Sequence, residues 1–209
     1  MLTKKLWGTF TLGALWCTLG ILLAGTKPCF SNNLNRIVVP ADSCIWYTSL
    51  AVMKSKAGVT EKTGRNDGTE IKQILAAVGL PEGNPYCAAF VVFGFKVAVS
   101  MCNTIKKIPI AVTALARGIW NSAKQTGRKA LTNKPQVGDI VVWGFSTKPN
   151  GHTGRITKVL AFWLVQMIEG NTSSGVKGSQ RDGGGIYYRT RDIDDDLAGM
   201  DVLGLIGHY

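Results

Sequence analysis

One stretch decides both the fold and the chemistry of this chain: PEGNPYCAAFVVF, residues 81–93. Its first half, residues 81–86, is rich in Pro and Gly and predicts a loop. From Cys87 the chain becomes an apolar segment that continues to about Cys102. Periodicity alone leaves strand and helix open, but a length above a dozen residues and the Ala88-Ala89 pair favour a helix. The sequence thus places a cysteine where a loop becomes a buried helix.

The segments around this stretch predict more helices before it and strands after it. Helical patterns cover residues 43–56, which Asp42 or Ser43 can cap, and residues 69–78 and 110–126. The second half of the chain has short β-branched or aromatic runs separated by turn clusters, at residues 137–143, 154–160, 164–169, 186–188 and 202–206. Helices followed by a meander of strands indicate an α+β fold, with N-terminal helices packed on an antiparallel sheet.

The first 26 residues predict export. Lys4 and Lys5 precede an uncharged apolar run, residues 6–25, which is typical of an export signal. Its length also approaches that of a membrane helix, so a cleaved signal peptide and a retained membrane anchor both remain open. In either case the positive-inside rule leaves everything after Thr26 outside the cytoplasm. We expect residues 27–42 to be a linker and residues 43–209 to form one domain.

Charge and cysteine content restrict the partners. The formal net charge of +11 suits an anionic partner such as teichoic acid, phospholipid headgroups or nucleic acid, although a solvated basic surface is an equal alternative. No basic run is interleaved with aromatic residues, so we expect no nucleic-acid partner. The five cysteines show no paired CxxC spacing, which argues against structural zinc. Cys29 and Cys44 are candidates for a disulfide outside the cytoplasm.

Cys87 is the candidate nucleophile. A thiol at the start of a helix lies at the positive end of the helix dipole, which favours the thiolate. The backbone N–H of the same residue, exposed at the helix start, can help to stabilise an oxyanion. The alternative is a buried structural cysteine, a description that fits Cys102 better.

The candidates for a general base are few, because the chain contains only two histidines. His208 is the penultimate residue, where chain ends tend to fray, so we favour His152. Glu169 and Asn171 lie at the end of the next predicted strand, and a hairpin could bring them beside His152. Either side chain can accept the Nδ1–H of the ring, which would leave Nε2 facing the thiol.

Four blocks of sequence occur in a recognisable order: PYCAAFV at residues 85–91, VGDIVVW at 137–143, GHTGRI at 151–156 and IEGNT at 168–172. Together they resemble the CHAP domain, a family of cysteine amidohydrolases and endopeptidases of peptidoglycan that is related to the NlpC/P60 hydrolases. The resemblance extends from about residue 51 to the C-terminus, and residues 61–68 also resemble the lead-in of one CHAP-like subgroup.

The resemblance implies a papain-like α+β fold and assigns roles to single residues. The catalytic residues would be Cys87, His152, Glu169 and Asn171, and the oxyanion or substrate-binding residues would be Tyr86 and Trp143. Tyr86 stands where some CHAP members have a glutamine, and residues 79–86 lack the acidic calcium-binding cluster of some phage members. We therefore expect no metal and no cofactor.

The expected function is hydrolysis of an amide in peptidoglycan by an exported enzyme, held to the membrane if the N-terminal segment is retained. The thiolate would form an acyl-enzyme, which water activated by His152 would hydrolyse. The bond can lie in the stem peptide, in a cross-bridge, or between muramic acid and its first alanine, so amidase and endopeptidase both remain open. Two alternatives are acyl transfer on the same scaffold and a catalytically silent module that binds wall glycan or an envelope protein.

Overall fold

The structure of the chain, a computed structural model, describes residues 34–175 and 183–209. The predicted export signal or anchor and Cys29 lie outside these described residues. Within the two described ranges, no helix combines the length and the apolar character that crossing a membrane requires.

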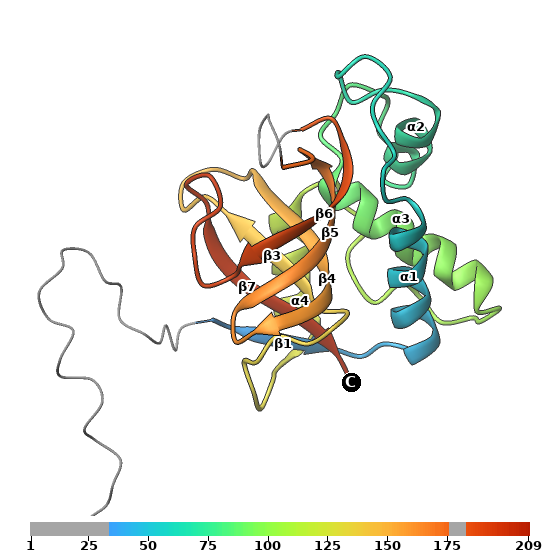
Figure 1. The fold of residues 1–209 in the computed structure, drawn as a ribbon. Helices are drawn as coiled ribbons and strands as arrows, with labels where there is room; N and C mark the ends of the chain where they lie inside the picture. Colours follow the sequence, from blue (N-terminus) through green and yellow to red (C-terminus); the bar gives the residue numbers. More distant parts are fainter. Residues whose placement is uncertain (1–33, 176–182) are drawn as a thin grey trace, which may run out of the picture. The chain divides into compact units, whose positions relative to one another are not determined.

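Four helices form in the described part of the chain: α1 (Ser43–Ser55), α2 (Thr69–Ala76), α3 (Cys87–Met101) and α4 (Ala116–Thr126) (Figure 1). The helix predicted to begin at Cys87 is therefore present. Asp42 caps α1, because its carboxylate accepts the Cys44 N–H at 2.8 Å. α4 begins at Ala116, later than predicted. The Thr113 hydroxyl accepts the Leu115 N–H at 3.1 Å, a local bond that competes with helix formation before that point.

Within residues 34–175 and 183–209, seven strands form one sheet in the order β2-β1-β7-β3-β4-β5-β6. The β1–β7 pair is parallel and the other neighbours are antiparallel. The α+β prediction is thus confirmed, with a sheet that is mostly antiparallel. The strands are β1 (Arg36–Val39), β2 (Arg128–Lys129), β3 (Ile140–Gly144), β4 (Gly151–Ala161), β5 (Leu164–Thr172), β6 (Gly185–Asp192) and β7 (Asp201–His208).

β1 lies inside the segment expected to be a linker, residues 27–42. Its Arg36 is buried and pairs with both carboxylate oxygens of Asp139, with Nε to Oδ2 at 2.8 Å and Nη2 to Oδ1 at 2.9 Å. The two residues are 103 positions apart, so the bond fastens the N-terminal end of the described chain to the turn before β3. No local pattern in residues 27–42 could indicate a partner at that distance.

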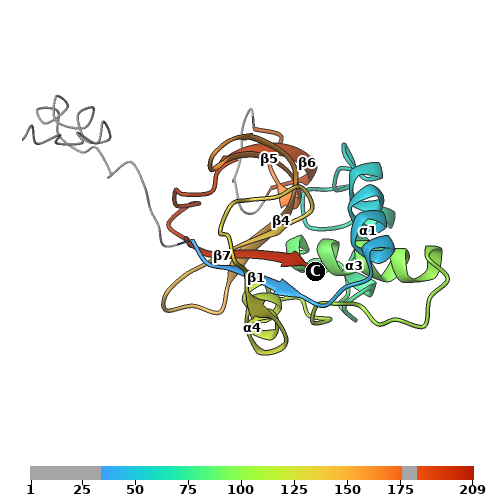
Figure 2. The ribbon, with the colours of Figure 1, turned by 90° about the horizontal axis from the view of Figure 1, so that it is seen from below.

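The sheet separates two groups of buried side chains. In β3, Ile140 and Val142 belong to the core formed with α1, α3 and α4, whereas Val141 and Trp143 belong to a second core on the other face. This alternation follows from the two-residue period of a strand. α1 and α3 pack side by side on the first face (Figure 2). The N-terminus of α3 is therefore held against the sheet by the larger core.

Arg155 of β4 fastens α1 to the sheet. Its guanidinium is fully buried and donates to the Gly138 carbonyl from Nε at 3.0 Å and from Nη2 at 2.8 Å. The same group donates to the Trp46 carbonyl at 3.1 Å and to the Ser49 hydroxyl, both in α1. Its carbon Cζ also lies 4.8 Å from the centre of the Trp46 ring. These bonds satisfy the buried charge of the guanidinium. The role of Arg155 is therefore structural: it holds α1 to the sheet.

A disulfide joins the same two helices. Cys44 in α1 is bonded to Cys102, at the end of α3, across a sequence separation of 58 residues. The suggested pairing of Cys44 with Cys29 is therefore wrong, and Cys102 is not a free buried cysteine. Packing of α1 on α3 brings the two Cα atoms within 6.1 Å, a proximity that the spacing of the cysteines does not reveal.

We predict that Cys102→Ser lowers the free energy of unfolding by about 2–4 kcal/mol, because the disulfide restricts a long loop in the unfolded chain. Urea denaturation of the oxidised proteins measures the difference. Cys44→Ser is the matched comparison and should lose the same free energy of unfolding. The free energy of unfolding of the reduced wild type should be close to that of both variants. Equal midpoints for the oxidised wild type and the two variants would contradict the assignment.

Candidate active site

Cys87 is the first residue of α3 and the free cysteine in the described part of the chain. Its side chain is nearly buried, and its Sγ lies 3.9 Å from the carbonyl oxygen of Gly151. Gly151 begins β4 and directly precedes His152. The start of α3 therefore lies next to the start of β4. Tyr86, at the N-cap of α3, makes no side-chain hydrogen bond to the N–H groups of the first helical turn.

His152 and Glu169 form a buried pair on adjacent strands. The Nε2 atom of His152 lies 2.9 Å from Oε2 of Glu169, and neither side chain is exposed to solvent. Glu169 stands opposite Gly154 in the β4–β5 register. A Cβ at Gly154 would lie 2.7 Å from Cγ of Glu169, so the glycine leaves the space that the carboxylate occupies. The structure thus brings Cys87, His152 and Glu169 together.

The imidazole has the opposite orientation to the one expected. Nε2, not Nδ1, binds Glu169. Nδ1 is buried and has no hydrogen bond of normal geometry within the described residues, while the Cys87 thiol interacts closely enough to raise the pKa of His152. We therefore assign Nδ1 as the atom that faces the thiol. The reason is positional: Cys87 approaches beside Gly151, next to the backbone of His152, whereas Glu169 reaches the far side of the ring.

The charges of the pair stabilise one another. Burial alone would lower the pKa of His152, but the close approach of the Cys87 thiol, the hydrogen bond with Glu169 and the charges of both groups raise it to about 9. Burial alone would raise the pKa of Glu169, but hydrogen bonds from Arg191 and His152 and their charges lower it to about 2. The arrangement therefore favours an imidazolium next to an ionised carboxylate at neutral pH.

Arg191 of β6 is the site residue that the sequence analysis missed. Its Nε donates to Oε1 of Glu169 at 2.8 Å, and its Nη2 donates to Oε2 at 2.7 Å. The sequence predicts that the strand run beginning at Ile186 ends at Tyr188, whereas β6 continues to Asp192. Had the strand been extended, its two-residue alternation would have placed position 191 on the same face as position 187, opposite Glu169 in the β5–β6 register.

Tyr86 is buried, and its hydroxyl is already bonded. It donates to Oε1 of Glu61 at 3.1 Å and accepts from the backbone N–H of Asn171. Burial and the charge of Glu61 raise the pKa of the phenol. Asn171 itself is buried at the end of β5 with a φ of 56°, a left-handed conformation that Asn tolerates better than most residues. The proposed roles of Tyr86 and Asn171 in catalysis remain predictions.

Trp143 lies opposite His152 in the β3–β4 register, with the two ring centres 6.0 Å apart. Its side chain is fully buried. The indole therefore lies beside the imidazole and, being fully buried, presents no open surface for substrate in this structure. The other histidine, His208, stacks on Trp46 with ring centres 4.9 Å apart, and it also contacts Tyr47.

Residues 79–171 match the CHAP domain. The match confirms the predicted resemblance, and it includes Cys87, His152, Glu169 and Asn171. CHAP domains are generally cysteine- and histidine-dependent amidases or peptidases. Comparisons with curated proteins and with solved structures found no match.

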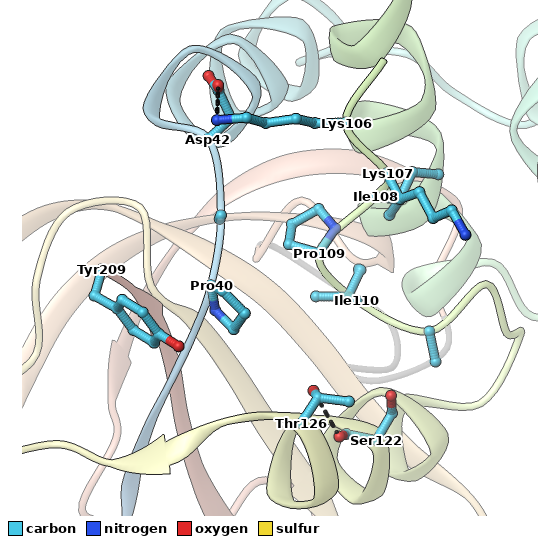
Figure 3. A pocket seen from close by; sticks show the side chains of 12 residues that line it. Pro40, Asp42, Lys106, Lys107, Ile108, Pro109, Ile110, Ser122, Thr126 and Tyr209 are labelled. Atoms are coloured by element: carbon cyan, nitrogen blue, oxygen red, sulfur yellow. Dashed lines mark hydrogen bonds and ion pairs between the residues drawn. The ribbon is translucent and has the colours of Figure 1, made fainter. Parts of the chain in front are cut away.

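A cavity of about 560 Å³ has a lining that includes none of Cys87, His152 and Glu169; Figure 3 shows the residues around it. Its walls come from the β1–α1 connection, the chain after α3, α4 and the C-terminal Tyr209. An ion pair between Lys106 and Asp42, at 2.9 Å, stands at one side. Among the described residues, no group of His, Cys, Asp and Glu side chains is arranged to hold a metal ion, and the expectation of no metal remains a prediction.

We predict that Gly154→Ala slows alkylation of Cys87 by iodoacetamide at neutral pH by about tenfold or more, since displacement of a catalytic group by about 1 Å has effects of this order. The added Cβ would push Glu169 away from His152. The control is Gly184→Ala, where an added Cβ meets no atom within 4 Å. Wild-type alkylation by a folded Gly154→Ala protein would contradict the geometry.

A second prediction concerns stability against pH. The pKa of His152 is raised from 6.5 to about 9, so its stabilising contribution is complete below pH 6.5 and is lost as the pH rises through about 9. We expect the free energy of unfolding to fall by up to about 3 kcal/mol over this range. Denaturant titrations at several pH values test it: His152→Gln should lose most of this fall, and His208→Gln should keep it.

Proposed function

We propose that the protein is an exported cysteine hydrolase that cleaves an amide bond of peptidoglycan. The match to the CHAP domain supports a peptidoglycan-related amidase or peptidase in general. The proposal that Cys87 is the nucleophile rests on one observation: the buried side chains of Cys87, His152 and Glu169 are in succession at the start of α3. A helix start, an imidazole and an orienting carboxylate together are what an activated thiol requires. We further assign the arrangement to the papain-like class.

The reaction begins with attack of the Cys87 thiolate on the carbonyl carbon of the amide. The C–N bond breaks as the imidazolium of His152 gives its Nδ1 proton to the leaving amine, which produces a thioester and a neutral imidazole. Nδ1 then takes a proton from water, whose oxygen attacks the thioester. Release of the carboxylic acid returns the thiolate and the imidazolium, so atoms and charges balance over the cycle.

The oxyanion of each tetrahedral intermediate needs hydrogen-bond donors near Sγ. The first-turn N–H groups of α3, including that of Cys87, are the candidates, because they have no side-chain cap at Tyr86. The Tyr86 hydroxyl is held by Glu61 and the Asn171 backbone. We therefore assign oxyanion stabilisation to backbone groups and give Tyr86 the task of fixing the helix start.

Export is supported from two sides. The N-terminal 26 residues have the composition of an export signal or anchor. The Cys44–Cys102 disulfide suits an oxidising compartment outside the cytoplasm.

The formal net charge of +11 suits the anionic polymers of a bacterial wall.

A silent binding module on the same fold is the rival. A protein that only bound wall glycan would gain nothing from burying an imidazole beside an ionised carboxylate, because such groups are costly to remove from water. The buried His152–Glu169 pair, with both side chains fully covered, therefore favours the enzyme.

Incubation of the purified protein with peptidoglycan, followed by mass analysis of the soluble fragments, tests the proposal. We expect the wild type to release peptides, Cys87→Ala to release none, and His152→Gln to act at least about 100-fold more slowly. His208→Gln is the matched control and should keep wild-type activity. Fragment masses distinguish an amidase from an endopeptidase.

Two results would overturn the proposal. Binding of peptidoglycan by both the wild type and Cys87→Ala, with no fragments from either, would favour the silent module. Equal release of fragments by the wild type and a folded Cys87→Ala protein would remove Cys87 from the mechanism.

A further inference from the structure

Glu169 is a buried carboxylate that two cationic side chains contact directly, and Arg189 of β6 adds a third positive charge within electrostatic reach. His152 approaches Oε2 at 2.9 Å from one side. Arg191 approaches from the other and binds both oxygens, at 2.8 and 2.7 Å, in the forked geometry that guanidinium and carboxylate share. Arg191 is itself 9% exposed, so this ion pair is largely removed from water. Both oxygens of Glu169 are thereby fixed, and with them the direction in which Oε2 meets the imidazole.

The same contacts set the charge on Glu169. A carboxylate that is fully covered would tend to hold a proton at neutral pH, because burial raises its pKa. Here the largest opposing influence is the hydrogen bond from Arg191, and together with His152 it lowers the pKa of Glu169 to about 2. A protonated Glu169 would carry no charge to stabilise the imidazolium. Arg191 thus helps His152 to keep the third group of the site charged.

We propose that Arg191 is a positioning residue for the catalytic site: it keeps Glu169 ionised and aligned while His152 gains and loses its proton. The proposal rests on the hydrolase mechanism above for its meaning in catalysis, although its effect on the Cys87 thiol does not require any substrate. Arg191 lies in β6, beyond the residues that match the CHAP domain.

The need for a second cation follows from the reaction cycle. With a charged imidazole, the buried groups alternate in sign from the Cys87 thiolate through His152 and Glu169 to Arg191. After His152 has given its proton to the leaving amine, Glu169 would lose its charged partner if His152 were the only one. Arg191 remains charged throughout, because a guanidinium is not deprotonated in proteins at these pH values. The carboxylate therefore keeps its charge and position when the neutral Nδ1 must accept a proton from water.

A purely structural role predicts something different. If Arg191 only held β6 to β5, its loss would lower stability and leave the titration of the site unchanged. If it positions Glu169, its loss must raise the pKa of Glu169 and weaken the imidazolium–thiolate pair at mildly acidic pH. The pH dependence of Cys87 reactivity distinguishes these two roles.

The experiment measures the rate of Cys87 alkylation by iodoacetamide against pH in the full chain, for the wild type, Arg191→Gln and Arg191→Lys. We expect the acidic limb of the Arg191→Gln profile to move upward by about one pH unit or more, since one unit corresponds to the loss of a single charge-assisted bond. Arg191→Lys keeps the charge but cannot bind both oxygens, and its limb should move less. With peptidoglycan, kcat should fall at least tenfold in Arg191→Gln while KM changes little.

The control is Thr190→Ala, on the exposed side of the same strand, which should keep the wild-type profile. Circular dichroism and thermal unfolding establish that each variant is folded. If Arg191→Gln does not fold, Arg191→Lys decides: an acidic limb identical to that of the wild type overturns the proposal. Failure of the wild type to cleave peptidoglycan, with the limb displaced in the variants, would overturn the proposed substrate and leave the role of Arg191 standing.

Discussion

The candidate site of this structure depends on keeping one carboxylate charged where water cannot reach it. Glu169 is fully buried, and a lone buried carboxylate would take up a proton. Its position between His152 and Arg191 compensates the charge from two strands at once. Three neighbouring strands must therefore pair in the correct register before the site exists, which makes the antiparallel hairpins from β4 to β6 part of the chemistry.

The blocks of sequence that resemble the CHAP domain combine folding and chemistry residue by residue. In the block at residues 151–156, His152 belongs to the site, Gly154 leaves room for Glu169, and Arg155 fastens the sheet to α1. In the block at residues 137–143, Asp139 holds Arg36, and the ring of Trp143 lies beside the imidazole. A motif of this kind marks the site because side chains of the same short strand both build the site and hold the fold together.

Sequence reasoning found what local pattern encodes and missed what distant segments supply. The helix start at Cys87 follows from a loop that meets an apolar run, and the hairpin that carries Glu169 to His152 follows from two strands and a short turn. The Arg36–Asp139 pair and the Cys44–Cys102 disulfide join segments 103 and 58 residues apart, and no periodicity encodes such a choice of partner. Arg191 was missed because charged residues near a strand end look solvated unless the strand is known to continue. The ring orientation of His152 depends on the direction from which α3 approaches, which only the packed structure defines.

The two ends of α3 carry sulfur in opposite redox states. Cys87 at the first residue is a thiol, and Cys102 just after the last residue is in a disulfide. A helix rises 1.5 Å per residue, so about 22 Å separates the two sulfur-bearing positions. Thiol–disulfide exchange requires the attacking sulfur to touch the disulfide, and a rigid helix between them prevents that contact within one molecule. The length of a single helix thus allows a free thiol and a disulfide to persist in the same small domain.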